Sequence, residues 1–412
     1  MNAQPWKTEQ WFTSPWNYAP DVRSGLALPE KVIFHDTTLR DGEQQAGVQF
    51  SARQKVSIAG VLAEAGVGRI EAGMPAVSPE DEAAVREIVK ADLPAEIYVL
   101  SRCMRADVQR AIDCGVDGVV MEIPSSRQLV ELGYRWSVQK AIDLCVEATA
   151  YAAAQGLKVS FFPVDASRAD MDEFLSLIRR VSTEGHMDSL GLVDTFGVLT
   201  PQAADYYTRQ CSQFGVPLEA HFHMDYQLGV ANSAMAVAAG ATVVHTTVGG
   251  LGERAGNTPL EDISLALLTM YGVDSGLDTT RLKKLNDLVM RFAGVPVPRQ
   301  RAIVGDGIFQ IESGMVAGWF GNVRDLDVTQ VFPYHPDLVG QHQAEVVLGK
   351  GSGPDSVVMA AAELGVTDLS TEQITELLTL LKAESLGLRR LLTLEEFARL
   401  LEDVRSGTPA PA

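Results

Sequence analysis

Between residue 31 and about residue 270, short β-rich runs alternate with longer stretches in which apolar residues recur at helical spacing. The longer stretches, such as ARQKVSIAGVLAEAG and RADVQRAIDCG, are typical of amphipathic helices that end at a glycine, which suits a left-handed C-cap. Eight β-rich runs can be distinguished, at residues 31–36, 67–74, 96–101, 115–123, 158–165, 187–195, 217–225 and 241–249.

Eight strand-then-helix units of about 30 residues each predict an α/β fold in which parallel strands close into a (β/α)8 TIM barrel. The competing interpretation is an open, doubly wound sheet, but no GxGxxG motif follows a strand. After about residue 275 the alternation stops, and a small, mostly helical C-terminal region is expected.

The chain is therefore expected to have four parts. Residues 1–29 form a Trp-containing N-terminal arm, 30–290 the catalytic barrel, 291–350 a linker or first subdomain, and 351–412 a helical second subdomain with a frayed tail. In the arm, Trp6, Trp11 and Trp16 recur at a spacing of five, which fits neither a helix face nor a strand face. Their indoles are expected to plug surface grooves of this chain or of a partner.

Charge and composition narrow the class of protein. The 412 residues carry a formal net charge of −19, which argues against nucleic acid or an anionic membrane as a partner, because both need a basic surface. The four cysteines form no CxxC pair and are expected to be reduced, buried thiols. Neither a signal peptide nor an apolar stretch long enough to span a bilayer is evident, so a cytoplasmic location is expected.

In a barrel of this kind the chemistry lies at the C-terminal ends of the strands. His221 and His223 end the seventh run, and residues two apart on a strand point the same way, so both imidazoles can bind one metal ion. The alternative is two ordinary histidines. Asp41 and Asn257 would add oxygen ligands, and the set suits Mg²⁺ or Mn²⁺, with Zn²⁺ as an alternative, while leaving room for a 2-oxo acid.

Two loops at the same face carry further candidate chemistry. HDTTLRDGEQ at 35–44 places Arg40 beside Asp41, and an arginine, which is always charged, can stabilise a substrate oxygen but cannot act as a base. GGLGERAGN at 249–257 contains glycines that allow backbone to approach a ligand closely. The alternatives are an ion-paired loop and a flexible connection.

Several motifs in fixed order resemble those of the DRE-TIM metallolyase superfamily, specifically its Claisen-condensing branch of 2-isopropylmalate, homocitrate and citramalate synthases. They are HDTTLRDGEQQAGVQFS, IEAGMPAVSPED, GLVDTFGVLTP, HFHMD and GGLGERAGNTPLED, followed by EVVLGKGSG and LTLEEFARLL. The resemblance covers roughly residues 31–405.

The resemblance implies a role for each matching residue. Asp41, His221 and His223 match the divalent-metal ligands, and Asn257 matches a ligand of the lyase branch. It also implies a homodimer whose C-terminal segments reach the partner barrel.

The implied reaction is enolisation of an acyl-CoA, typically acetyl-CoA, and attack on the keto carbon of a 2-oxo acid. Thioester hydrolysis then drives the condensation. In this scheme Arg40 stabilises the enolate oxygen, while Gln44 and Thr195 hold the 2-oxo acid.

Two positions depart from the family pattern. Val164 and Val316 stand where the family has a glutamate and a histidine, and valine cannot move a proton. Replacement catalytic groups are therefore expected among Glu219, Tyr334 and His335, with Glu71, Glu122 and Asp165 also open. Glu219, two residues from His221, is alternatively a supporting partner of that histidine.

Some properties of the substrate can be inferred from residues expected at the pocket. Phe161, Phe162 and Val164 on the fifth run favour an apolar or small 2-oxo acid, whereas Arg102 and Ser125 are further candidates for substrate binding. Three functions stay open: an acyl-CoA:2-oxo acid condensing enzyme of non-standard specificity, a metal-dependent carbon–carbon lyase acting on a 2-hydroxy acid without acyl-CoA, and an inactive barrel that serves in binding or regulation.

Overall fold

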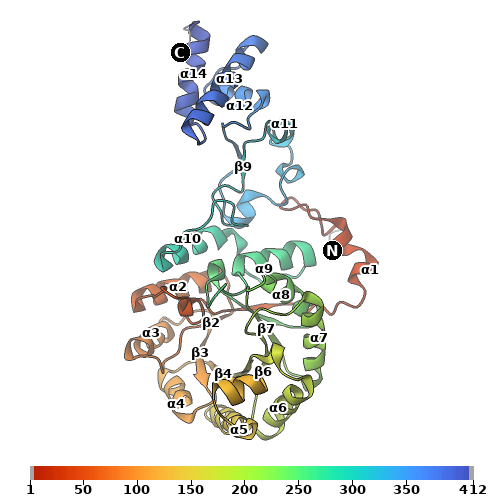
Figure 1. Ribbon diagram of the computed structural model, residues 1–412, viewed down its shortest axis with the longest axis vertical. Helices are drawn as coiled ribbons and strands as arrows, with labels where there is room; N and C mark the ends of the chain where they lie inside the picture. The colour runs from red at the N-terminus through yellow and green to blue at the C-terminus, as the bar shows by residue number, and fades with distance from the viewer. Residues whose placement is uncertain (1–3, 408–412) are drawn as a thin grey trace. The chain divides into compact units, whose positions relative to one another are not determined.

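Eight parallel strands close into a barrel in the order of the sequence, with β1 hydrogen-bonded to β8 (Figure 1). The computed structural model describes residues 4–407. The strands are β1 (Ile33–Asp36), β2 (Arg69–Glu71), β3 (Glu96–Arg102), β4 (Gly118–Pro124), β5 (Lys158–Val164), β6 (Ser189–Asp194), β7 (Leu218–Phe222) and β8 (Val243–Thr246). The predicted (β/α)8 barrel is confirmed.

Helices surround the strands, as Figure 1 shows for the barrel. They are α2 (Ala52–Glu64), α3 (Pro79–Lys90), α4 (Arg105–Cys114), α5 (Val138–Ala154), α6 (Met171–Glu184), α7 (Pro201–Cys211), α8 (Gly229–Ala238), α9 (Leu260–Ala266) and α10 (Leu282–Ala293). Local sequence explains their limits: the side chain of Ser51 caps α2, Thr200 caps α7, and Gly115 ends α4 with φ of +77°.

Apart from β3, which extends one residue beyond its run of 96–101, the strands are shorter than the runs that predicted them, because the runs also contain turn residues. The run 67–74, for example, yields only Arg69–Glu71, and Gly73 after it has φ of +142°, which a β-strand does not accommodate. The extra residues form the loops at the C-terminal ends of the strands, which carry the candidate site.

Alternate residues of neighbouring strands point into the barrel. Tyr98, Leu100, Val120, Phe162 and Val193 form one buried apolar cluster. Glu122, two residues beyond Val120 on β4, is aligned with Arg102 of β3 and with Phe162 of β5. Strand alternation therefore places the Glu122 side chain on the inner side, towards the C-terminal end of the barrel.

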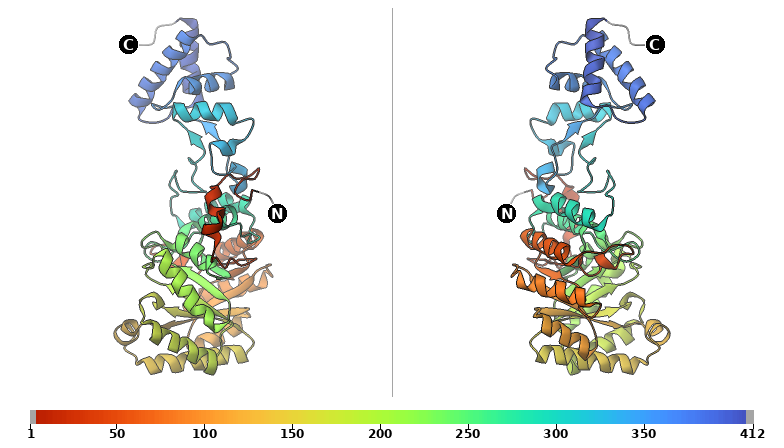
Figure 2. Two further views of the ribbon diagram at one scale, coloured as in Figure 1. Left: turned by 90° about the vertical axis from the view of Figure 1, so that its right-hand side faces the viewer. Right: turned by 90° about the vertical axis from the view of Figure 1, so that its left-hand side faces the viewer.

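The chain divides into two compact units, residues 16–297 with the barrel and residues 4–15 together with 298–407. The second unit contains β9 (Gln310–Ile311), α11 (Gly314–Val323), β10 (Glu345–Val346), α12 (Pro354–Glu363), α13 (Thr371–Leu388) and α14 (Leu394–Ser406). Strands β9 and β10 pair in parallel. The last three helices lie together at the C-terminal end of the chain (Figure 2). They share one apolar core that includes Leu377, Leu381 and Phe397.

The N-terminal segment differs from the expected plugging arm. Its described part divides between the two units, and it includes the short helix α1 (Pro20–Arg23). Trp11 is half-buried and pairs with Tyr334, whereas Trp16 is 80% exposed. The indole of Trp16 therefore fills no groove of this chain, and the alternative, a groove of a partner, stays a prediction. Residues 1–3 of the arm and 408–412 of the expected tail lie outside the described residues.

All four cysteines are buried and none is bridged to another. Among residues 4–407, no helix combines the length and the apolar character that crossing a membrane requires.

Candidate active site

Asp41 is held in place by a tight turn after β1. The backbone N–H groups of Arg40, Asp41 and Gly42 all donate to the Thr37 carbonyl oxygen, at 3.0, 2.8 and 3.1 Å. The 3-10 helix Gly42–Gln44 follows directly. This turn buries the Asp41 carboxylate, which is 3% exposed as a residue, at the C-terminal end of the barrel.

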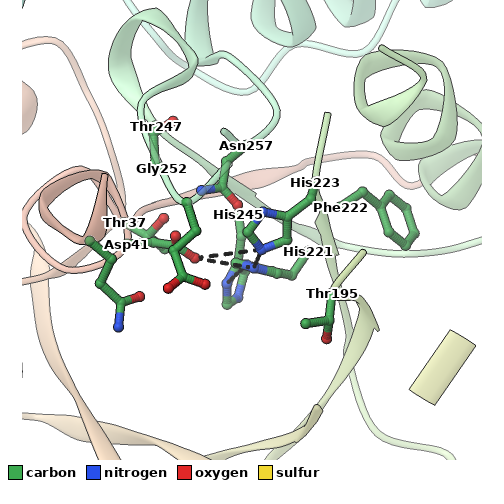
Figure 3. A network of polar contacts seen from close by, with 12 residues as sticks. Thr37, Asp41, Thr195, His221, Phe222, His223, His245, Thr247, Gly252 and Asn257 are labelled. Atoms are coloured by element: carbon green, nitrogen blue, oxygen red, sulfur yellow. Dashed lines mark hydrogen bonds and ion pairs between the residues drawn. The ribbon is translucent and has the colours of Figure 1, made fainter. Parts of the chain in front are cut away.

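The imidazoles of His221, on β7, and of His223, directly after that strand, face that carboxylate (Figure 3). The Nε2 atoms of His221 and His223 lie 3.3 Å apart, and they lie 3.4 and 3.8 Å from Asp41 Oδ2. The predicted same-side placement of the two histidines is therefore what the structure contains.

Asn257 joins this group from the loop after β8. Its Nδ2 donates to the Leu251 carbonyl oxygen at 3.2 Å, while its Oδ1 is buried without a hydrogen-bond partner. Gly252 lies between Asn257 and Asp41: a Cβ atom there would be 2.2 Å from Asn257 Nδ2 and 3.2 Å from Asp41 Oδ1. The loop can bring both side chains together because this position has no side chain.

These residues fit a divalent metal ion. Asp41 Oδ1 and Asn257 Oδ1 are buried acceptors without a partner, which is unfavourable unless something binds them. Neighbouring ligand atoms of an octahedral ion at about 2.1 Å are about 3 Å apart, close to the 3.3 to 3.8 Å between the Asp41, His221 and His223 atoms. Two nitrogens and two oxygens suit Mn²⁺ or Mg²⁺, with Zn²⁺ as an alternative.

A chain of buried groups orients His221 from below. Glu219 Oε2 accepts from His245 Nε2 at 2.8 Å, which leaves His245 Nδ1 as an acceptor. That atom lies 3.3 Å from His221 Nδ1, so His221 donates there and its Nε2 lone pair faces Asp41 and His223. Sequence reasoning missed His245; the signal that could have found it is its position inside the eighth run, at the same level as His35 of β1.

The site keeps its ligands in the protonation states that metals require. Burial lowers the pKa of His221 to about 3 and also lowers the pKa of His223, so both imidazoles are neutral near pH 7. Burial alone would raise the pKa of Asp41, but the positive charge of the adjacent Arg40 lowers it, and the net pKa lies well below its ordinary value.

Arg40 is fixed beside the ligands by several carboxylates. Its Nε and Nη2 donate to Glu71 Oε1 and Oε2 at 2.8 and 3.2 Å, and its Nη1 donates to Asp41 Oδ2 at 3.0 Å and to Gln44 Oε1 at 3.1 Å. The guanidinium carbon lies 6.0 Å from the centre of the Phe162 ring. The structure therefore groups Arg40, Gln44 and the ligand set at one mouth of the barrel.

Three other predicted residues lie around this mouth and are already engaged. Thr195 Oγ1 accepts from the Asp165 N–H at 2.8 Å, which leaves its proton free to donate. Ser125 Oγ donates to the Val164 carbonyl oxygen at 2.8 Å. Arg102 forms two hydrogen bonds with Asp107, at 2.6 and 3.1 Å, so its charge is already paired within the protein.

The predicted catalytic residue Glu219 does not belong to the ligand set. Glu219 is fully buried below it and accepts from Arg69, Ser160 and His245 at 2.7, 2.8 and 2.8 Å. Burial raises its pKa, but His245 and Arg69 outweigh that effect and lower it, so Glu219 is a poor proton acceptor here.

Tyr334 and His335 belong to the second unit. Tyr334 pairs with Trp11, and the backbone N–H of His335 donates to the Gln10 carbonyl oxygen at 2.7 Å. A catalytic role for either residue stays a prediction.

Comparison with known proteins identifies the family of the chain. The model of the HMGL-like family matches residues 31–289. The chain is 38% identical over 400 residues to homocitrate synthase AksA of Methanopyrus kandleri. This match covers 96% of the present chain and 98% of the synthase. The chain is 36% identical over 363 residues to 2-isopropylmalate synthase of Methanocaldococcus jannaschii, covering 87% of this chain and 69% of that protein.

Among solved structures, an HMG-CoA lyase from Bacillus subtilis superimposes with a TM-score of 0.59 at 20% identity, over 66% of this chain and 96% of that chain. At that identity the likeness concerns the fold alone. The family model and the two synthases go further: the chain belongs to the HMGL-like (DRE-TIM) family, in the Claisen-condensing branch of acyl-transferring enzymes.

Proposed function

We propose that the chain catalyses a divalent-metal-dependent condensation of acetyl-CoA with a 2-oxo acid whose side chain is uncharged. The observation that carries the proposal is the convergence of Asp41, His221, His223 and Asn257 beside an arginine that Glu71 and Gln44 hold in place. The relatives named as homocitrate and 2-isopropylmalate synthases support the same reaction class.

Each group at the mouth has a defined task in this proposal. When bound, Mg²⁺ or Mn²⁺ supplies Lewis-acid polarisation of the keto group. Arg40 stabilises the negative charge that develops on the thioester oxygen during enolisation, because its guanidinium is permanently charged and already oriented. Gln44 and the free proton of the Thr195 hydroxyl bind the carboxylate of the 2-oxo acid.

The surroundings favour a neutral substrate side chain. Met74 and Val164 are partly buried apolar residues that pack against the inner cluster near Phe162. A cavity of about 710 Å³ adjoins Arg40 and Gln44, and its lining includes Met74 as well as acidic residues such as Glu43 and Asp81. A second carboxylate on the substrate would face those acidic groups.

The arginines near the mouth are also neutralised within the protein. Arg102 pairs with Asp107 at 2.6 Å, Arg168 with Asp165 at 2.6 Å, and Arg254 with Asp225 at 2.9 Å. A distal carboxylate bound by one of these arginines would lie beside the acidic partner of that arginine, which is unfavourable because the two charges repel. We therefore propose small or apolar 2-oxo acids such as pyruvate or 2-oxoisovalerate as substrates, and a homodimer as the working form.

The experiment that tests this proposal is free-thiol release from acetyl-CoA in the presence of Mg²⁺ or Mn²⁺ and a panel of 2-oxo acids. Release with pyruvate or 2-oxoisovalerate and much less with 2-oxoglutarate is the expected result. Release only with 2-oxoglutarate would overturn the neutral-side-chain proposal. A lack of release with every acid would overturn the condensation itself.

A further inference from the structure

The carboxylate of Glu122, on β4, lies at the mouth of the barrel without a bonding partner among the described residues. Among residues 4–407 its side chain forms no hydrogen bond and no ion pair, although the carboxylates around it, Glu71, Asp107 and Asp165, are all paired. The residue is half-buried, whereas its neighbours Met121 and Ile123 on the strand are buried. An unpaired carboxylate in such a position lowers stability and calls for an explanation.

Glu122 lies near the arginine of the candidate active site. Its strand register aligns it with Phe162, and the Arg40 guanidinium carbon lies 6.0 Å from the centre of that ring. Arg40 and Glu122 are close enough for each charge to affect the pKa of the other. The carboxylate thus shares the barrel interior with the arginine that is assigned to the thioester oxygen.

We propose that Glu122 is the base that removes a proton from the acetyl-CoA methyl group, an inference that rests on the proposed condensation. The methyl C–H bond breaks, its proton passes to a Glu122 carboxylate oxygen, and the electron pair forms the C=C bond of an enolate whose oxygen is stabilised by Arg40. The enolate carbon then attacks the keto carbon, and the new alkoxide takes a proton from solvent. Glu122, which is partly open to solvent, releases its own proton there.

The electrostatic surroundings of Glu122 suit this task. Burial raises its pKa, Arg40 and Arg102 lower it, and Glu71 and Asp41 raise it, with a net result above the ordinary glutamate value. Tyr134, whose pKa the Glu122 charge raises, and the buried thiol of Cys103 are the other titratable groups facing it. A carboxylate with a raised pKa is a stronger base than a free glutamate.

Other candidates for the base are less suitable. Glu219 is fully hydrogen-bonded and its pKa is lowered, and Glu71 is engaged by two hydrogen bonds from Arg40. Asp165 is paired with Arg168 and with Ser126. Val164 on the neighbouring strand cannot accept a proton, so Glu122 is the free carboxylate that the described inner face offers.

The test compares Glu122→Gln, Glu122→Asp and the control Glu131→Gln. Glu131 lies in the loop after the same strand, and its carboxylate is paired with Arg127 at the exposed rim. Three quantities are measured with Mn²⁺ and the best 2-oxo acid: kcat from thiol release, the isotope effect on kcat with methyl-deuterated acetyl-CoA, and the Mn²⁺ dissociation constant by calorimetry.

We expect Glu122→Gln to lower kcat by about 100-fold or more, with Mn²⁺ affinity unchanged and a larger deuterium isotope effect, because proton removal becomes the slow step. Glu122→Asp should retain more activity than Glu122→Gln, and Glu131→Gln should match the unaltered chain. A loss of less than about tenfold in Glu122→Gln, or a loss that follows a loss of bound Mn²⁺, would overturn the assignment while leaving the proposed condensation intact.

Two further outcomes are also decisive. If the unaltered chain releases no thiol with any 2-oxo acid, both the proposed condensation and the proposed role of Glu122 are wrong. If Glu122→Gln does not fold, Glu122→Asp carries the test: a lower kcat and a shifted acidic limb of the pH profile support the role, and unchanged values for both contradict it.

Discussion

Replacing Arg40 with lysine separates the shape of the guanidinium from its charge. Arg40 forms four hydrogen bonds in the site, two with Glu71 and one each with Asp41 and Gln44, at 2.8 to 3.2 Å. A lysine keeps the positive charge but presents it at a single atom, and it cannot reproduce the paired bonds to Glu71. The Arg40→Lys variant therefore has a cation whose position is no longer fixed against the thioester oxygen.

The expected loss in kcat can be taken from the known effect of losing one oriented donor. Removing one pre-oriented donor to a developing oxyanion lowers kcat by about 10²–10³-fold, or about 2.7–4 kcal/mol. We expect Arg40→Lys to fall in this range, with little change in KM for acetyl-CoA, because the lost interaction is formed in the transition state. Mn²⁺ should still bind, since Asp41 and both histidines remain.

The assay is thiol release at saturating Mn²⁺, combined with calorimetric titration of the metal-free protein. Arg180→Lys is the matched control, because Arg180 is paired with Glu184 on the surface of α6, away from the candidate site. A kcat for Arg40→Lys within about threefold of the unaltered chain would refute the role assigned to the guanidinium. A loss of Mn²⁺ binding would instead show that Arg40 supports the metal ligands.

Three other predictions test the ligand set. Gly252→Ala should weaken Mn²⁺ binding by about tenfold or more, because the added Cβ collides with Asn257 Nδ2 and approaches Asp41; an unchanged dissociation constant in calorimetry would contradict this. Asp41→Ala or His221→Ala should abolish metal binding and thiol release together, and a fully active, metal-free variant would refute the site. The free energy of unfolding of the metal-free protein should fall as the pH drops below about 6.5, because the unfolded chain then binds protons on His221 and His223 that the folded chain, with lowered pKa values, does not bind. Urea titrations should show up to about 1.4 kcal/mol per pH unit for each histidine, and a flat profile would contradict the lowered pKa values.

The barrel could be predicted from sequence because its signal is local. Each β-rich run and each amphipathic stretch reports its own structure, and the glycine at the end of a helix, such as Gly115, marks the boundary. Strand limits were less accurate, since apolar residues continue into the turns beyond strands such as β2. The environment of the N-terminal tryptophans could not be predicted, because nothing local distinguishes an exposed indole such as Trp16 from a packed one.

The candidate site also combines features that are local in the sequence with features that only the folded chain creates. The spacing of His221 and His223 on one strand is local and predicts their shared direction, and the loops with Asp41 and Asn257 come together because all strand ends meet at one mouth. The partners of Glu219 were not predictable, because Arg69 lies 150 residues away in sequence. The free state of Glu122 is likewise a property of the folded barrel, since a sequence does not show which carboxylates remain unpaired.

The central claim is metal-dependent condensation of acetyl-CoA with a neutral 2-oxo acid, and one measurement tests it most directly. Metal-free protein is incubated with acetyl-CoA and pyruvate or 2-oxoisovalerate, and free thiol is followed before and after Mn²⁺ is added. The account predicts thiol release that needs both the metal and the 2-oxo acid. Thiol release that does not depend on Mn²⁺, or no thiol release with either 2-oxo acid, would contradict the central claim.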